Sequence, residues 1–421
     1  MVALAIRLIA LIAIPCLSVA APIDPVAHPP DTWPRFRGHD GDGIGSGFRF
    51  PAPWSEKAIR WKIDLPGSGH SSPAVWKDRV FVTSCDAKTA KRILSCFAAT
   101  DGHVLWQRAF ESQVHPMNKD NSYASSTPAV NERAVFIYWT KPDEATVAAL
   151  DHDNKELWRS SLGPFKSQHG GGTSPVCVGD RVVVGNDQDG ESSLIGLDAT
   201  TGKVSWKIDR KTDKAAYSTP CVRRLAGGAQ ELIFTSTSHG LTGVDPKSGK
   251  VNWDLADAFP MRVVGSAAIA DGLVAATCGG GGIGRKLVIA KPGDGGSKGS
   301  VVYEAKALTS YVPTPIAVGG LLFLWGDKGT VVCMRARSGE KVWEQKLEGT
   351  FYCSPIFSEG RLFCVSREGT LFVIAAGDKY EQIAAVPLGE RSFATPAIAN
   401  GTMYLRTETH LMAIGSASAT R

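Results

Sequence analysis

Two stretches, IGLDATTGKVSW (residues 195–206) and TGVDPKSGKVNW (residues 242–253), share an aspartate, a glycine turn and a terminal tryptophan. In each, a short apolar segment leads through the turn into a second strand-like segment. The stretches begin 47 residues apart. Recurrence at such an interval indicates a repeat protein, in which one supersecondary unit is stacked many times.

A second pattern extends this repeat over nearly the whole chain. Eight short stretches open with a small residue, usually followed by proline, and continue as an apolar strand. Further strand-like segments follow each opening, so a unit holds four strands, with proline only at a strand start. This describes a β-propeller blade, whereas a helical solenoid would need apolar residues at a spacing of 3.6. The anchor positions are Pro73, Pro128, Pro175, Pro220, Ala267, Pro315, Pro355 and Pro396, which lie 40 to 55 residues apart.

The last unit ends near Ile414 without its fourth strand. The segment AIRWKIDLPG, which begins at residue 58, has Trp61 in the register of the other tryptophans and can supply that strand. Closing the ring in this way pairs two otherwise exposed edges. We therefore predict an all-β, eight-bladed propeller of four-stranded antiparallel blades over residues 58–414, preceded by an extended arm (21–57) and followed by a tail (415–421).

Composition agrees with this class. The 421 residues include 45 glycines and 24 prolines, which argues against a helical bundle. Disorder is excluded because 43% of the residues are hydrophobic, among them 11 Trp and 16 Phe. A net charge of +5 without long basic runs gives no indication of nucleic-acid or membrane-surface binding.

Residues 1–20 are predicted to be an export signal. One positive charge, Arg7, precedes an apolar run too short to span a bilayer, and Ser18-Val19-Ala20 is a suitable cleavage sequence. Lipidation at Cys16 and a buried first helix are the alternatives. No other run approaches membrane length, so we expect an exported, periplasmic or extracellular monomer without a transmembrane segment.

Eight cysteines follow the signal, and no two are adjacent. Most lie in strand-like segments, where a buried thiol is the usual outcome. Only Cys85 and Cys96 flank one short polar loop, and we predict a disulfide between them.

The quoted stretches resemble the docking motif of the PQQ-like (quinoprotein-type) β-propeller repeat, A-x-D-x-x-T-G-x-x-x-W, with Gly196 and Gly243 in place of the usual alanine. The resemblance covers residues 58 to 414 and implies that the tryptophan packs between neighbouring blades, as its large flat ring suits. Tyr303, and Tyr380 less clearly, occupy the slot in two other units. The predicted docking residues are Trp61, Trp106, Trp158, Trp206, Trp253 and Trp343.

The family includes quinoprotein dehydrogenases and non-catalytic relatives such as the BamB-type periplasmic scaffold. The dehydrogenases have a disulfide between adjacent cysteines and a calcium-binding carboxylate cluster, and this sequence shows neither. We therefore predict a non-catalytic binding or scaffold module for a protein or polymer partner in the cell envelope, with no catalytic residues, cofactor or metal. The alternatives are an enzyme, either a PQQ- and calcium-dependent dehydrogenase or a hydrolase with a non-obvious site, and a purely structural module whose activity resides in a partner.

Three local motifs have alternative interpretations. CGGGGIGRK, from residue 278, satisfies G-x-G-x-x-G but precedes a strand, so a hairpin loop is favoured over a phosphate site. NDQDGES, from residue 186, lacks the distal carboxylate of a calcium loop and is interpreted as a turn. DTWPRFRGHDGDGIG, from residue 31, belongs to no repeat and is either an arm packed across the propeller or a segment that faces a partner.

In each unit, one residue that lies three to six positions before the anchor is predicted to line one mouth of the central channel. They are aromatic, His or Arg, unlike ordinary turn residues, and such side chains are typical of binding surfaces. The alternative is that these rings only plug the channel. The candidates are His70, Tyr123, His169, Tyr217, Arg262, Tyr311, Tyr352 and Phe393.

Overall fold

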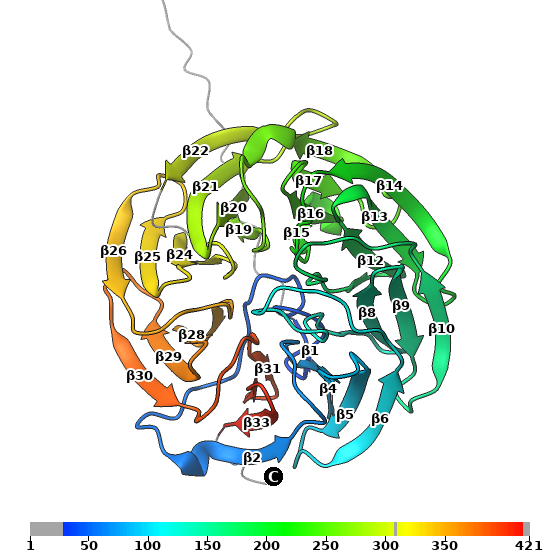
Figure 1. The fold of residues 1–421 in the computed structure, drawn as a ribbon. Helices are drawn as coiled ribbons and strands as arrows, with labels where there is room; N and C mark the ends of the chain where they lie inside the picture. Colours follow the sequence, from blue (N-terminus) through cyan, green and yellow to red (C-terminus); the bar gives the residue numbers. More distant parts are fainter. Residues whose placement is uncertain (1–27, 307–309, 416–421) are drawn as a thin grey trace, which may run out of the picture.

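Eight antiparallel sheets surround a central channel (Figure 1) in the computed structural model, which describes residues 28–306 and 310–415. Seven sheets have four strands and one has five, so the predicted eight-bladed, all-β propeller is confirmed. The predicted signal peptide and residues 416–421 lie outside the described residues. Within the described ranges, no helix has the length and apolar character needed to cross a bilayer.

Each blade begins at the channel with a short innermost strand and ends with an outermost strand on the rim. Blades 1 to 4 contain β3 (Ala74–Trp76), β4 (Arg79–Cys85), β5 (Arg92–Ala98) and β6 (Val104–Phe110); β7 (Ala129–Val130), β8 (Val135–Lys141), β9 (Glu144–Leu150) and β10 (Glu156–Ser161); β11 (Val176–Val178), β12 (Arg181–Asn186), β13 (Gly190–Asp198) and β14 (Val204–Thr212); β15 (Cys221–Arg224), β16 (Gln230–Ser236), β17 (Gly240–Val244) and β18 (Val251–Leu255).

The remaining blades repeat this plan, and three short 3-10 helices, η1 (Glu56–Ala58), η2 (Ala226–Gly228) and η3 (Ala256–Ala258), lie in connections. Blades 5 to 8 contain β19 (Ala268–Ala270), β20 (Leu273–Gly280), β21 (Ile283–Lys291) and β22 (Ser300–Lys306); β23 (Ile316–Val318), β24 (Leu321–Trp325), β25 (Thr330–Arg335) and β26 (Lys341–Lys346); β27 (Ile356–Ser358), β28 (Arg361–Val365), β29 (Thr370–Ala375) and β30 (Gln382–Pro387); β31 (Ala397–Ala399), β32 (Thr402–Arg406) and β33 (His410–Ile414), with β2 (Ile59–Asp64) outermost.

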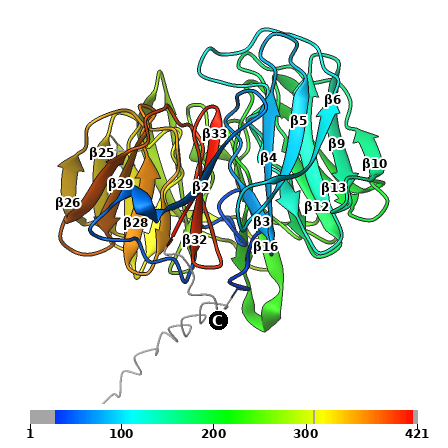
Figure 2. The ribbon, with the colours of Figure 1, turned by 90° about the horizontal axis from the view of Figure 1, so that it is seen from below.

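The ring closes through β2, as the sequence predicts. β2 pairs antiparallel with β33, with Trp61 opposite Ala413 and Asp64 opposite His410. Figures 1 and 2 show this blue strand beside the red C-terminal strands. The last blade therefore consists of strands from both ends of the chain, and its edge is covered.

A bulge recurs where the outermost strand of every blade pairs with its neighbour. In blade 3 the register shifts between Gly196 and Leu197, so that Gly196 lies opposite Trp206. Corresponding shifts occur in all eight blades. A β-bulge changes the direction of the side chain that follows it, and here it precedes the docking residue. A Cβ at Gly196 would lie 2.2 Å from the Trp206 ring, which explains why glycine replaces the family's alanine.

The docking side chains reach the next blade. The Trp206 indole Nε1–H donates to the Pro246 carbonyl of blade 4 at 2.9 Å. Trp61, Trp106, Trp158 and Trp343 make the same kind of bond, as does the Tyr303 hydroxyl. Trp253 differs, because its partner is Glu231 of its own blade, at 2.9 Å.

The slot suggested for Tyr380 is wrong. In blade 7 the register places Ala384 at the docking position, opposite Val373. Tyr380 instead lies before the strand and packs edge-on against Trp343, with ring centroids 5.5 Å apart.

The disulfide predicted between Cys85 and Cys96 is also wrong, since both are free thiols. Cys85 pairs with Arg92 across the β4–β5 hairpin, whereas Cys96 pairs with Phe81. The two cysteines are thus offset by four strand positions, about 13 Å, which is too far for a disulfide. Cys85 is the last residue of β4, whereas Cys96 is the fifth residue of β5, so flanking the same loop does not place them opposite each other.

The N-terminal arm packs across the propeller, on the lower side in Figure 2. β1 (Thr32–Trp33) adds a fifth strand to blade 1 through β3. Backbone hydrogen bonds continue to other blades, from Val222 to Asp40 and in both directions between Phe357 and residues 43–45. Trp33 and Phe48 are fully buried. These contacts favour the packed-arm interpretation.

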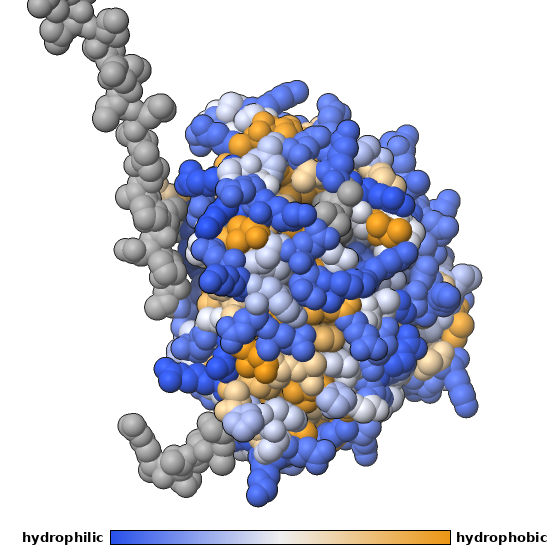
Figure 3. Space-filling view, turned by 90° about the vertical axis from the view of Figure 1, so that its left-hand side faces the viewer, coloured by the Kyte–Doolittle hydropathy of each residue, from blue (hydrophilic) through white to orange (hydrophobic). Residues whose placement is uncertain are grey.

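The outer side of the ring is mainly polar. Hydrophilic residues cover most of the side that carries β22, β26 and β30, with separate hydrophobic patches between them (Figure 3). Val301 and Val302 on β22 are 42% and 47% exposed. Isolated apolar side chains of this kind are ordinary on a soluble surface.

Candidate functional site

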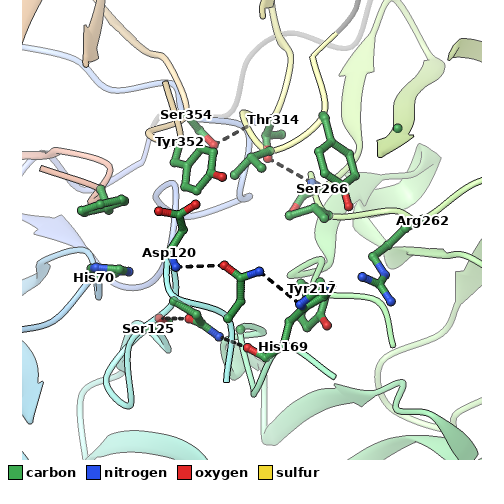
Figure 4. A pocket seen from close by; sticks show the side chains of 18 of the residues that line it. His70, Asp120, Ser125, His169, Tyr217, Arg262, Ser266, Thr314, Tyr352 and Ser354 are labelled. Carbon is green, nitrogen blue, oxygen red and sulfur yellow. Dashed lines mark hydrogen bonds between the residues drawn. The ribbon is translucent and has the colours of Figure 1, made fainter. Parts of the chain in front are cut away.

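A cavity of about 770 Å³ opens at the mouth of the channel opposite the arm. Seven of the eight predicted mouth residues line it, and Figure 4 shows side chains that face its centre from several blades. All of them are partly exposed. The seven are His70, His169, Tyr217, Arg262, Tyr311, Tyr352 and Phe393.

Tyr123 does not line this cavity. Its hydroxyl donates to the His115 carbonyl at 2.7 Å, and its ring lies 5.8 Å from the Arg92 guanidinium. The segment that precedes blade 2 folds back on itself here, so this ring packs behind the mouth and not in it.

The connection between β6 and β7 (residues 111–128) supplies cavity residues that the sequence analysis did not select. Asp120 binds Arg367 of blade 7 at 2.5 Å, and Asn121 donates to the His169 carbonyl of blade 3 at 2.7 Å. The connection therefore reaches across the mouth. The longest interval between anchors, from Pro73 to Pro128, was the signal that could have found it.

Positive charge surrounds the histidines of the mouth. Burial, with Arg406, Arg391 and Arg367 nearby, lowers the pKa of His70 to about 3. The pKa of His169 is also lowered, by burial and by Arg262. Both imidazoles are therefore neutral at pH 7. Aromatic rings share this environment, because the Arg367 guanidinium lies 4.4 Å from the centroid of Tyr352 and 5.2 Å from that of Phe393.

A closed ring of eight hydroxyls forms the lower wall of the cavity. In each blade the backbone N–H of the residue before the anchor donates to the side-chain hydroxyl of its counterpart in the next blade, at 2.9–3.1 Å. Two of these bonds, through Ser266, Thr314 and Ser354, are visible in Figure 4. Serine and threonine alternate around this hydroxyl ring, which consists of Ser72, Thr127, Ser174, Thr219, Ser266, Thr314, Ser354 and Thr395.

The arm closes the channel below the hydroxyl ring. Phe36 lines the bottom of the cavity, while the flanking arginines are buried. Arg35 donates to the Pro220 carbonyl at 2.8 Å, and Arg37 donates to the Pro355 and Pro315 carbonyls at 2.7 and 3.1 Å. A Cβ at Gly43 would lie 2.9 Å from the Arg37 guanidinium, so glycine leaves the room that this side chain needs.

The side chains that line the cavity do not provide the oxygen ligands that a calcium-bound quinone needs. Calcium takes six to eight oxygen ligands, usually with several carboxylates. Asp120 is the only carboxylate among the described lining residues, and Arg367 already binds it. Likewise, the described part of the chain contains no group of three His, Cys, Asp or Glu side chains arranged to hold a metal ion.

Fold and site together define an eight-bladed propeller with one open mouth and one closed by its own N-terminal arm. The chain matches the model of the family described as outer membrane protein assembly factor BamB, over residues 54–138, 90–284 and 288–419. It belongs to this family of PQQ-like β-propellers.

The curated relatives include both a dehydrogenase and an assembly factor. Polyvinylalcohol dehydrogenase from a Pseudomonas species is 29% identical over 262 residues, which is 56% of this chain and 37% of the relative. The outer membrane protein assembly factor BamB of Moranella endobia is 23% identical over 272 residues, which is 60% of this chain and 66% of the relative. The chain thus matches less than two thirds of the length of either protein.

Solved structures agree on the fold. BamB from Moraxella catarrhalis superposes with a TM-score of 0.60 at 15% identity, covering 86% of this chain and 98% of that one. Quinohemoprotein alcohol dehydrogenase from Comamonas testosteroni gives 0.64 at 11% identity, covering 93% and 81%. At these identities the likeness is one of fold alone.

Proposed function

We propose that this protein is a non-catalytic propeller of the cell envelope that binds a protein or polymer partner at the open mouth of its channel. The observation on which this depends is the cavity of about 770 Å³, whose rim combines aromatic rings with polar ends. Side chains of this kind bury a large contact area and still offer hydrogen bonds, which is why they dominate binding sites.

The composition of the cavity favours binding over catalysis. Its only carboxylate among the described residues is held by Arg367, and both histidines lie with arginines that disfavour protonation. A general acid or base needs a pKa near the working pH. The membership in a family described by an outer membrane assembly factor is consistent with an exported scaffold.

The mouth is tested by the double substitution Tyr217→Ala and Tyr352→Ala. We expect it to abolish capture of the partner from an envelope extract and to leave the melting temperature nearly unchanged, because both rings are partly exposed. The Tyr217 hydroxyl bonds only to Ser167 among the described residues, at 3.0 Å.

The matched control is Tyr217→Phe with Tyr352→Phe, which keeps both rings and should retain most of the capture. If the alanine variant still captures the partner, the partner docks elsewhere. If the alanine variant unfolds, the rings pack the channel and do not form a binding surface. Either result contradicts the proposal.

A PQQ-dependent dehydrogenase is the second candidate, because polyvinylalcohol dehydrogenase is among the relatives. When bound, PQQ would be the oxidant that accepts electrons from an alcohol substrate. Asp120 is the only carboxylate among the described lining residues, and Arg367 binds it. We therefore expect no quinone absorbance on the protein after incubation with PQQ and calcium, and no dye-linked alcohol oxidation. Stoichiometric quinone binding followed by turnover would overturn the non-catalytic proposal.

A further inference from the structure

We propose that the hydroxyl ring is a binding site for one small anionic group, a carboxylate or an inorganic oxyanion. This inference goes beyond the proposed function, because it concerns the base of the cavity and holds whichever partner binds at the rim.

The first argument is the inventory of donors in the hydroxyl ring. A hydroxyl has one O–H donor and two acceptor lone pairs, and each of the eight already accepts one backbone N–H. The Thr395 hydroxyl donates to the Cys353 sulfur, and among the described residues none of the other seven hydroxyls donates a hydrogen bond to the protein. All eight residues are at most 5% exposed, and all line the cavity. Seven buried O–H donors without a protein acceptor therefore lie around one axis.

The second argument is charge. Arg35, Arg37 and Arg406 are fully buried, and none forms a salt bridge with a described carboxylate. Their guanidinium groups bind backbone carbonyls next to the hydroxyl ring: Arg35 at Pro220, Arg37 at Pro315 and Pro355, and Arg406 at Ser71. Arg35 Nη2 also lacks a hydrogen-bond partner among the described residues.

Nearby acidic groups offset part of this charge; beside Arg406 they are Glu390 and Glu408. Asp40 is bound to Arg224 and His28, at 2.9 and 3.1 Å, and the carboxylate of Asp42 accepts the Ile44 N–H at 2.9 Å. At the rim, Lys214 and Arg262 add positive charge to the lining. Unpaired O–H donors on the wall of a cavity, with cations buried behind that wall, favour an anion over a cation, which would need oxygen lone pairs and negative charge.

The test uses trifluoroacetate as the probe, followed by fluorine NMR in chloride-free buffer with the protein of residues 21–421. We expect saturable broadening and shift of its signal. Acetate and phosphate should displace it, whereas neutral acetamide should not. Their relative potency distinguishes a carboxylate site from a phosphate site. Absence of saturable binding, or equal displacement by acetamide, would mean that water alone occupies the hydroxyl ring.

The site is located by the variant Ser174→Ala with Thr219→Ala, which removes two neighbouring donors beside the Pro220 carbonyl that binds Arg35. Hydrogen bonds to a charged group are strong, so we expect trifluoroacetate to bind at least about tenfold more weakly. The matched control, Ser174→Thr with Thr219→Ser, keeps both hydroxyls and should bind within about twofold of the wild type. Unchanged affinity in the alanine variant contradicts the proposal.

A second measurement applies if the alanine variant does not fold. Crystals of the wild-type protein soaked in bromide should show an anomalous peak within hydrogen-bonding distance of the ring hydroxyls. Bromide peaks found elsewhere, with none at the hydroxyl ring, would overturn the assignment.

Discussion

Replacing Ala58–Pro66 with a glycine–serine linker of equal length should abolish cooperative folding and cause aggregation. This replacement removes β2, so the edge of β33 and the side of blade 8 that Trp61 covers become exposed. Unpaired edge strands are templates for intermolecular pairing, and no other described strand covers β33 on that side. Keeping the length of the segment leaves the arm free to reach its normal contacts.

The measurement is a thermal melt followed by circular dichroism, with size-exclusion chromatography for aggregation. As a control, a synthetic peptide of residues 58–66 is added in trans, and it should restore part of the soluble protein by strand addition. A soluble linker variant with a single cooperative transition would show that the ring does not need this strand.

Replacing Trp206 with alanine should lower the free energy of unfolding by roughly 3–5 kcal/mol, the range for large aromatic truncations in a core. Trp206 is 8% exposed and lies between Gly196 of its own blade and Gly249 of blade 4. A Cβ at Gly249 would lie 2.6 Å from the ring, so the two blades are in tight contact there. Truncation leaves a cavity at this contact and removes the bond to the Pro246 carbonyl.

Val204→Ala is the matched control for this prediction. Val204 lies on the same strand but is 55% exposed, so its truncation should change stability by less than about 0.5 kcal/mol. Both variants are compared by denaturant titration. A loss below about 1 kcal/mol for Trp206→Ala would show that the docking role is wrong and that this ring is available for another function.

The blade pattern was predictable because it is local. An aspartate, a glycine turn and a tryptophan within a dozen residues specify one strand pair, and stacking repeats the result around the axis. Closure of the ring was predictable from the number of strands in each unit. The final unit has only three strands, and the early strand that contains Trp61 is the one available to cover both exposed edges. Seven mouth residues were found because each lies three to six residues before its anchor, in the segment that leads into an innermost strand.

Register across a hairpin was not predictable to the same degree. Cys85 and Cys96 flank one polar loop, but Cys85 is the last residue of β4 and Cys96 the fifth residue of β5, so they lie four positions apart in register. Tyr123 has the correct place in the repeat, but the long connection before it folds back and turns its ring away from the cavity.

The chain by itself determined the number of blades, their order and the strand that closes the ring, since each depends on spacing along the sequence. Only the tertiary structure decided the base of the cavity. Arg35 meets Pro220 at a separation of 185 residues, and Arg37 meets Pro355 at 318. The Ser or Thr before each anchor looks like an ordinary small turn residue, and its hydroxyl acquires a partner only when the neighbouring blade is in place. The physical reason is that a ring of hydrogen bonds exists only after eight separate units have closed around one axis.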